Sequence, residues 1–407
     1  MNIIKTFAIL FSLSAFLSLA EEKVLYIYQD ADLSHHSESS EAIQKGIEVA
    51  FNEIDNLIDG YKVEFKYLDH RGNVIRSKRN YQQFIADANA LAIYSGIHSP
   101  PLIKNRSFIN ENQALTLVPW AAGGPITRYP SKENWVFRLS VDDTKAGPVI
   151  IDFAMNAQKC QSPHLILEET PWGNSNLKSM SQALKKYAIN TPKVTRFSWN
   201  LKGKGARNVL DTIKQAGSDC IVLVSNAVEG MVLVNEMLKR PKDERLPIIS
   251  HWGITGGNFH EVINSDKRNE LDLHFIQSCF SFTNEHQSQL AQNVFSQLIQ
   301  HSKGEIVKPA DLKSAVGFIH AYDLSKLLIH AIKQAGITGN IIADRNAIRL
   351  ALESLTSPIA GLVKTYNKPF SVFDEKLNFN AHEALDKENY CMGSFGINDE
   401  ILIYQSN

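Results

Sequence analysis

The chain of 407 residues carries 42 Lys and Arg against 43 Asp and Glu, a formal net charge of −1. This balance excludes a protein held on nucleic acid or anionic lipid by an excess of basic residues. The 22 Gly and 14 Pro are ordinary counts for this length, which excludes collagen-like and disordered chains. At roughly 100–200 residues per domain, the length indicates two or three domains.

The N-terminus has the pattern of a secretory signal peptide. Lys5 precedes an uncharged apolar run over 6–17, and Ser18 and Ala20 place small side chains at the two positions that signal peptidase recognises. The alternative is a transmembrane anchor, but the run is shorter than the roughly 20 residues that a spanning helix needs. The sequence therefore predicts a signal peptide over 1–20 and an exported, soluble mature chain.

The four cysteines are Cys160, Cys220, Cys279 and Cys391. In an oxidising compartment they allow three complete pairings. Cys160 and Cys220 each stand at the start of an expected strand, and the starts of parallel strands can be neighbours. A Cys160–Cys220 disulfide and free buried thiols are both compatible with this placement. No cysteine spacing resembles a zinc site.

Strands and helices alternate along the first part of the chain. Apolar runs and alternating patterns predict strands over 24–28, 62–68, 91–94 and 115–118. Apolar residues at helical spacing predict helices over 41–56 and 73–87. This order predicts right-handed βαβ units and a parallel sheet.

The same alternation restarts near residue 146. The expected helices of this second unit cover 146–156, 176–187, 208–216 and 230–240, and its strands cover 164–167, 193–197, 220–224 and 247–250. After an extended stretch come three helices and a strand-like tail, over 287–301, 311–335, 346–354 and 361–404. The predicted fold class is α/β, with two open parallel-sheet units. Ligands of such sheets bind beyond the carboxyl ends of the strands.

The chain has no recognisable catalytic motif. It lacks a GxSxG nucleophile elbow, a phosphate-binding GxxxxGK[ST] loop and an HExxH zinc motif. The adjacent acids Asp142-Asp143 and Glu168-Glu169 are interpreted as solvated charge. We therefore expect no catalytic residue, no cofactor and no enzymatic activity.

A histidine pair, His35-His36, lies in the polar loop after the first expected strand. Two imidazoles can bind a metal ion, but a loop pair of this kind is more often polar surface. The sequence therefore predicts no metal site.

The five tryptophans divide into two groups. Trp120, Trp172 and Trp252 directly follow expected strands, and small or flexible residues come after each of them. A lone Trp is usually part of a core, but three in equivalent places indicate a binding site. Trp135 and Trp199 lie outside such loops and are expected to be structural.

Several segments together resemble a known family. In chain order they are QKGIEVAFNEI at 44–54 with Asp69, YSGIHS at 94–99, VPWAA at 118–122, FRL at 137–139, PWG at 171–173 and GFIHAYD at 317–323. The chain looks like a type I periplasmic binding protein of the branched-chain amino-acid (Leu/Ile/Val) receptor family. The resemblance covers nearly all of the mature chain.

The resemblance implies two lobes that are joined by three crossovers and close on a ligand. We expect the crossovers near 139–142, 278–283 and 354–358. Both lobes are then discontinuous in sequence, with lobe 1 over 21–140 and 282–354, and lobe 2 over 141–281 and 355–407.

The resemblance also implies where lobe 1 would contact the ligand. The family holds a ligand carboxylate with the loop that here contains His98 and Ser99. Its next loop has Pro, small residues and often a hydroxyl residue. Here Trp120 and Ala122 stand in that loop and the hydroxyl is missing.

Lobe 2 is expected to contribute three ligand-binding residues. Trp172 matches the family's aromatic residue that stacks on the ligand, and Asn226 lies in a further binding loop. Trp252 takes the place of the carboxylate that accepts the ammonium in amino-acid binders. A buried ammonium without acceptors costs several kcal/mol, so a standard amino acid is not expected. These two departures from the family pattern, the missing hydroxyl and the missing carboxylate, favour an aromatic, apolar or quaternary-ammonium ligand.

These expectations define a function and its partners. The protein is expected to be a periplasmic monomer that binds a small molecule by hinge closure and delivers it to an inner-membrane ABC permease. The alternative is a receptor that signals to a membrane histidine kinase or cyclase. No nucleic-acid partner is expected.

Overall fold

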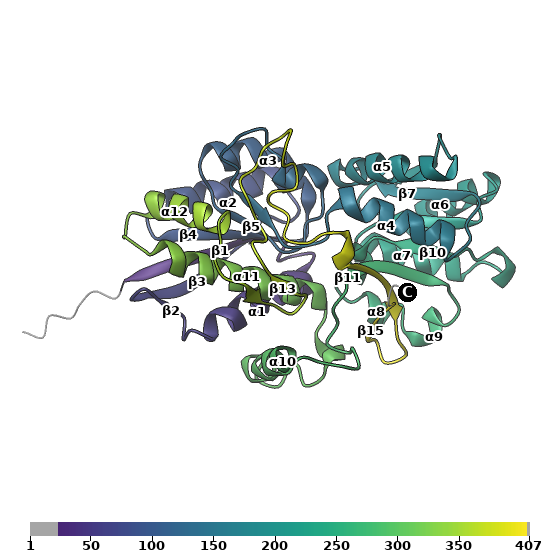
Figure 1. Cartoon of the computed structure of the whole chain (residues 1–407). Helices are drawn as coiled ribbons and strands as arrows, with labels where there is room; N and C mark the ends of the chain where they lie inside the picture. Colours follow the sequence, from purple (N-terminus) through teal and green to yellow (C-terminus); the bar gives the residue numbers. More distant parts are fainter. Residues whose placement is uncertain (1–22, 405–407) are drawn as a thin grey trace, which may run out of the picture.

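The computed structural model describes residues 23–404, in which two α/β units lie side by side (Figure 1). The signal peptide predicted over 1–20 lies outside the described residues. Within the described range, no helix has the length and apolar character that crossing a membrane would need.

The first unit is built on a six-stranded sheet in the order β2-β3-β1-β4-β5-β6. All neighbouring strands are parallel except β2 and β3, which pair antiparallel. The strands are β1 (Val24–Ala31), β2 (Leu57–Ile58), β3 (Tyr61–Asp69), β4 (Ala90–Ser95), β5 (Thr116–Val118) and β6 (Val136–Arg138).

Helices cover both faces of this sheet, as the alternating buried residues of β1 require. Ile27 belongs to the core formed with α1 (Ser37–Asn52) and α11 (Ala315–Ala335), and Tyr28 belongs to the core formed with α2 (Val74–Ala86) and α3 (Ser99–Glu111). The helices α10 (Gln289–His301) and α12 (Ile341–Leu352) complete this unit.

Gly46 permits the close crossing of α1 and α11. A Cβ atom at this position would lie only 2.4 Å from the main-chain oxygen of Phe318 on α11. A side chain at position 46 would therefore force the two helices apart.

The second unit holds a seven-stranded sheet in the order β15-β14-β11-β10-β9-β7-β8. Its parallel part contains β7 (Pro163–Glu168), β8 (Lys193–Phe197), β9 (Cys220–Val224), β10 (Ile248–Ser250) and β11 (Leu273–Ser278). The last two strands pair antiparallel and are β14 (Tyr390–Phe395) and β15 (Ile401–Ile403).

Two pairs of helices cover the two faces of the second sheet. One core contains residues of α4 (Asp143–Asn156) and α5 (Pro171–Leu184), and the other contains residues of α6 (Gly203–Gln215) and α7 (Ala227–Leu238). Two short helices follow β10, α8 (Phe259–Val262) and α9 (Ser265–Arg268). The predicted α/β class with two parallel-sheet units is thus confirmed.

The C-terminal segment contacts the first unit before it joins the second. The hairpin of β12 (Ile359–Ala360) and β13 (Thr365–Tyr366) packs on α11, where the Asp323 carboxylate accepts hydrogen bonds from the backbone N–H groups of Leu362 and Val363. Only β14 and β15, the yellow strands of Figure 1, belong to the second sheet.

Helix α3 is an element that the sequence did not predict. Pro100 and Pro101 stand in the first turn of this helix. Proline is tolerated there because the first N–H groups of a helix have no partner within the helix. As a result, His98 is the N-cap residue and Ser99 opens the helix.

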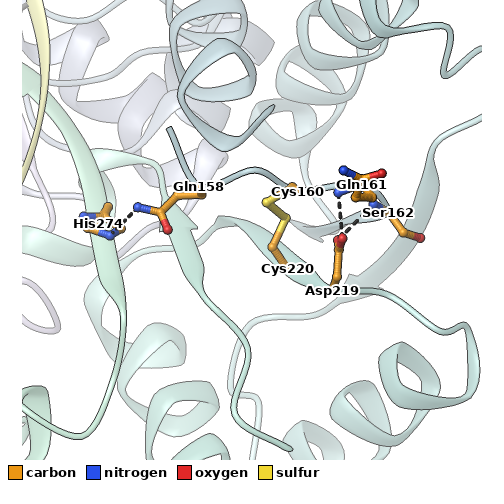
Figure 2. The surroundings of a disulfide bond; sticks show 7 residues. All are labelled: Gln158, Cys160, Gln161, Ser162, Asp219, Cys220 and His274. Atoms are coloured by element: carbon orange, nitrogen blue, oxygen red, sulfur yellow. Dashed lines mark hydrogen bonds between the residues drawn. A yellow bond between two sulfur atoms is a disulfide. The ribbon is translucent and has the colours of Figure 1, made fainter. Parts of the chain in front are cut away.

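Both disulfides lie in or beside the second sheet. Cys160 is bonded to Cys220, the first residue of β9, and Figure 2 shows this bond with its surroundings. Beside it, the Asp219 carboxylate accepts hydrogen bonds from two backbone N–H groups at 2.6 and 2.9 Å. The second bond joins Cys279 to Cys391 of β14. The Cys160–Cys220 pairing is one of the alternatives that the sequence left open.

Candidate functional site

Aromatic side chains from both units meet where the parallel strands end. Trp120 follows β5 of the first unit, and Trp252 begins the short helix η4 (Trp252–Thr255) after β10 of the second unit. Their ring centroids lie 5.7 Å apart, and the ring of His320 on α11 lies 5.2 Å from Trp252. Both indoles are almost fully buried. These rings form a direct contact between the units.

Trp172 and Asn226 approach this cluster from the second unit. A Cβ atom at Gly253 would lie 3.0 Å from Cη2 of Trp172 and 3.0 Å from Oδ1 of Asn226. The absence of a side chain at position 253 therefore lets both residues approach the loop of Trp252. The fold thus brings Trp120, Trp172, Asn226 and Trp252 into one neighbourhood.

Asp143 places a carboxylate beside these rings. Its Oδ1 accepts a hydrogen bond from Nε1 of Trp172 at 3.3 Å and lies 3.1 Å from Nε2 of His251. Its Oδ2 is buried and has no hydrogen-bond partner among the described residues. The interpretation of Asp142-Asp143 as solvated charge is wrong, because both side chains are fully buried.

Ser99 and Ala122 make their polar contacts within the protein. The Ser99 hydroxyl accepts a hydrogen bond from the N–H of Gly123 at 3.0 Å. The carbonyl oxygen of Ala122 accepts a hydrogen bond from the N–H of Asp143 at 2.9 Å. These bonds tie the loop after β5 to the starts of α3 and α4.

An open cavity of about 210 Å³ lies beside the buried aromatic cluster. The first unit lines it with Asp32, His35, His36, Arg71, Gly72 and His98, and the second with Trp199, Asn200, Asn226, Val228 and Glu229. Of the binding residues expected from sequence, His98 and Asn226 line this cavity. Because both units contribute to its wall, a relative movement of the units would open or close it.

Trp199 is the binding-site candidate that sequence reasoning overlooked. Its ring centroid lies 5.3 Å from that of His98, across the boundary between the units. Like the other three tryptophans, Trp199 comes shortly after the end of a strand, since it lies two residues after the end of β8. Trp135, by contrast, is fully buried in the core, in line with a structural role.

Two carboxyl groups in or near the cavity, those of Asp32 and Glu168, have shifted pKa values. Burial opposes the ionisation of Asp32, but hydrogen bonds from His98 and the His35 backbone outweigh it and hold the pKa of this carboxyl below its usual range. Burial raises the pKa of Glu168 to about 7, although hydrogen bonds from Trp199 and Thr170 oppose the shift. A cation beside Glu168 would favour its charged form.

Solved structures of similar fold are periplasmic binding proteins. A type 1 protein from Bordetella pertussis Tohama I has 17% identity and a TM-score of 0.77, with 94% of this chain and 100% of that chain covered. A leucine-binding protein from Thermotoga maritima has 15% identity and a TM-score of 0.72, with 94% and 98% covered. An R. palustris solute-binding protein in complex with benzoate has 15% identity and a TM-score of 0.73, also with 94% and 98% covered.

At these identities the likeness shows the fold, and the family follows from the sequence. No curated protein matches the chain. The family model described as periplasmic binding protein matches residues 32–240, which is more than half of the chain. The chain therefore belongs to the periplasmic binding protein family, with the type I fold that its resemblance to branched-chain amino-acid receptors implied.

Proposed function

We propose that the protein is a periplasmic, monomeric solute-binding protein that delivers a small molecule to an inner-membrane ABC importer. The observation that carries this proposal is the cavity between the units, with His98 on one wall and Trp199 and Asn226 on the other. A ligand that contacts both walls stabilises the closed form. The leucine- and benzoate-binding relatives support a small organic solute. We infer that the protein binds this solute without turning it over.

The ligand we propose is an organic cation, with a quaternary ammonium as the lead class among the aromatic, apolar and quaternary-ammonium molecules that the sequence favours. Trp199 offers an aromatic ring to the cavity, and Asp32 and Glu229 offer carboxylates. Cation–π contacts of about 0.5–2 kcal/mol each add to the attraction of the acids. Arg71 also lines the cavity and carries the opposing charge, which favours a ligand that sits toward Trp199.

We further propose revised lobe boundaries. Lobe 1 would combine 23–140 with 282–389, and lobe 2 would combine 141–281 with 390–404. The contacts of Asp323 with the segment after α12 support the extension of lobe 1 beyond residue 354. The three crossovers would then lie near 140, 280 and 389, where the chain passes between the two sheets.

A thermal-shift screen tests the function. Quaternary amines, aromatic acids, short-chain acids and amino acids would be added to the mature protein, and a quaternary amine should raise Tm most. Trp199→Ala should abolish this rise. Trp135→Phe is the matched control, because it lowers Tm in the core but leaves the ligand-induced rise intact.

Two outcomes would contradict the proposal. If leucine or valine raises Tm most strongly, the proposed ligand class is wrong. If Trp199→Ala retains the full rise, the ligand binds elsewhere. Co-purification with the ligand-loaded protein then tests the partner, since recovery of a histidine kinase or cyclase in place of a permease would indicate signalling.

A further inference from the structure

Three loops of the first unit bring two imidazoles and one carboxylate together. Asp32 directly follows β1, His36 is the N-cap residue of α1, and His98 is the N-cap residue of α3 after β4. One potential ligand atom from each residue lies within 4.8 Å of the others. Because β1 and β4 are neighbours in the sheet, their following loops meet at the same edge.

The two histidines have nitrogen atoms that the fold leaves without partners. Nδ1 of His98 is buried and has no hydrogen-bond partner among the described residues, and only 6% of this residue is exposed. The imidazole of His36 has no hydrogen bond in residues 23–404 and meets His98 edge to face, with ring centroids 4.8 Å apart. Buried polar atoms are normally paired, so the unpaired Nδ1 of His98 indicates that a ligand belongs here, and the half-buried ring of His36 offers a second nitrogen beside it.

The carboxylate is already held in place. Oδ1 of Asp32 accepts a hydrogen bond from the backbone N–H of His35 at 2.9 Å, and Oδ2 lies 3.3 Å from Nε2 of His98. The bond from the His35 backbone is an outer contact that orients the Asp32 carboxylate, whereas the contact with His98 joins two members of the proposed site. Within residues 23–404, the ion-pair partners of Asp32 are the histidines His35 and His98.

We propose that Asp32, His36 and His98 form a binding site for one divalent transition-metal ion such as Zn²⁺. Imidazole nitrogen and carboxylate oxygen are ligands that Zn²⁺, Cu²⁺ and Ni²⁺ accept, and three protein ligands leave a coordination position open. The adjoining cavity of about 210 Å³ leaves room for water or a ligand group at that position. The ion would lie on the wall of the first unit and face Trp199 of the second.

The structure contains one competing group, and its chemistry excludes it. Among the described residues, Cys160, Asp219 and Cys220 also lie close enough to one another for metal binding. The two sulfur atoms are joined in a disulfide, so neither is available as a thiolate ligand (Figure 2). A stoichiometry of one ion per chain is therefore expected.

The metal site shares Asp32 and the cavity wall with the proposed solute site, so Zn²⁺ binding is measured in the absence of any solute. Titration of chelator-treated mature protein with Zn²⁺ alone, followed by calorimetry, should give one site per chain. His36→Ala and His98→Ala should each weaken binding by more than about 100-fold, since each removes a direct ligand. His301→Ala is the control, because this histidine pairs with Glu48 outside the cluster and should leave Zn²⁺ affinity unchanged.

A spectroscopic measurement guards against misfolding of the buried His98 variant. Co²⁺ bound at this site should give visible d–d absorption that His36→Ala removes, and circular dichroism checks that the variant is folded. Cu²⁺ should quench the fluorescence of Trp199, and Trp199→Phe should remove that part of the quenching. Wild-type protein that binds neither Zn²⁺ nor Co²⁺, or a folded His36→Ala variant that binds as wild type, overturns the proposal. Solute-induced thermal shifts that persist in either case leave the proposed transport function standing.

Discussion

Arg138 and Glu383 form a buried two-point ion pair between the end of β6 and the C-terminal segment. Nε of Arg138 donates to Oε2 of Glu383 at 2.8 Å, and Nη2 donates to Oε1 at 2.6 Å. Both side chains are almost fully buried, and Nη2 also donates to Asp142 at 2.9 Å. This pair fixes the C-terminal segment beside the first crossover between the units.

Removal of the Glu383 carboxylate should strongly destabilise the protein. Glu383→Ala should lower the free energy of unfolding by about 3–5 kcal/mol, because it leaves the buried Arg138 with an incomplete set of partners. Urea denaturation measures the loss. Glu261→Ala is the control, since its pair with Lys313 is half exposed and should contribute less than about 1 kcal/mol. Equal effects of the two variants would contradict the prediction.

Glu168 should make stability depend on pH. Its pKa rises from an ordinary 4.5 to about 7 because burial disfavours the charged form. Between these values the folded state binds more protons than the unfolded state, so the free energy of unfolding falls as pH rises from about 4.5 to 7. Relative to wild type, Glu168→Gln should gain roughly 2–3 kcal/mol between pH 4.5 and pH 8.

Urea denaturation of both proteins at the two pH values measures this gain. Glu169→Gln is the matched control, because the neighbouring side chain is exposed and should shift stability little at either pH. The prediction fails if Glu168→Gln follows wild type at both pH values.

The contact between Gly317 and Trp120 should tolerate no added side chain. A Cβ atom at position 317 would lie 2.9 Å from Cζ3 of Trp120. Gly317→Ala should therefore lower the free energy of unfolding by about 1–3 kcal/mol through overpacking. Adding Trp120→Phe should recover part of the loss, because the smaller ring makes room. A double variant that loses the full sum of the two single effects would show that the two positions do not interact.

The two disulfides should contribute similar stability. They close loops with sequence separations of 60 and 112 residues. In the chain-entropy account, removal of either one should cost roughly 4 kcal/mol. The paired serine variants of Cys160 with Cys220 and of Cys279 with Cys391, measured by urea denaturation, test this. A loss below about 1 kcal/mol for either pair would rule out the entropic estimate.

The fold could be predicted because its determinants are local. Apolar periodicity along β1 and α1 and the order of strands and helices require parallel sheets with helices on both faces. Short motifs in fixed order were enough to indicate the family. Helix α3 could not be predicted in this way, because Pro100 and Pro101 would break a helix in its interior but stand here in its first turn.

Only part of the candidate site could be predicted from the sequence, because the burial of a side chain and its distance from others are properties of the tertiary structure. No sequence pattern separates a solvated Asp143 from one buried beside Trp172. Trp199 carried the positional signal of a binding residue, yet only the fold brings it against His98 of the other unit.

The cluster of Asp32, His36 and His98 likewise depends partly on local sequence and partly on the tertiary structure. Asp32 stands four residues before His36, which is a local signal, but His98 lies far along the chain. The sequence by itself determined most of the strands and helices, since apolar burial follows a local period. Only the pairing of β1 with β4 brought the three side chains together, because contacts between distant residues depend on strand order and register.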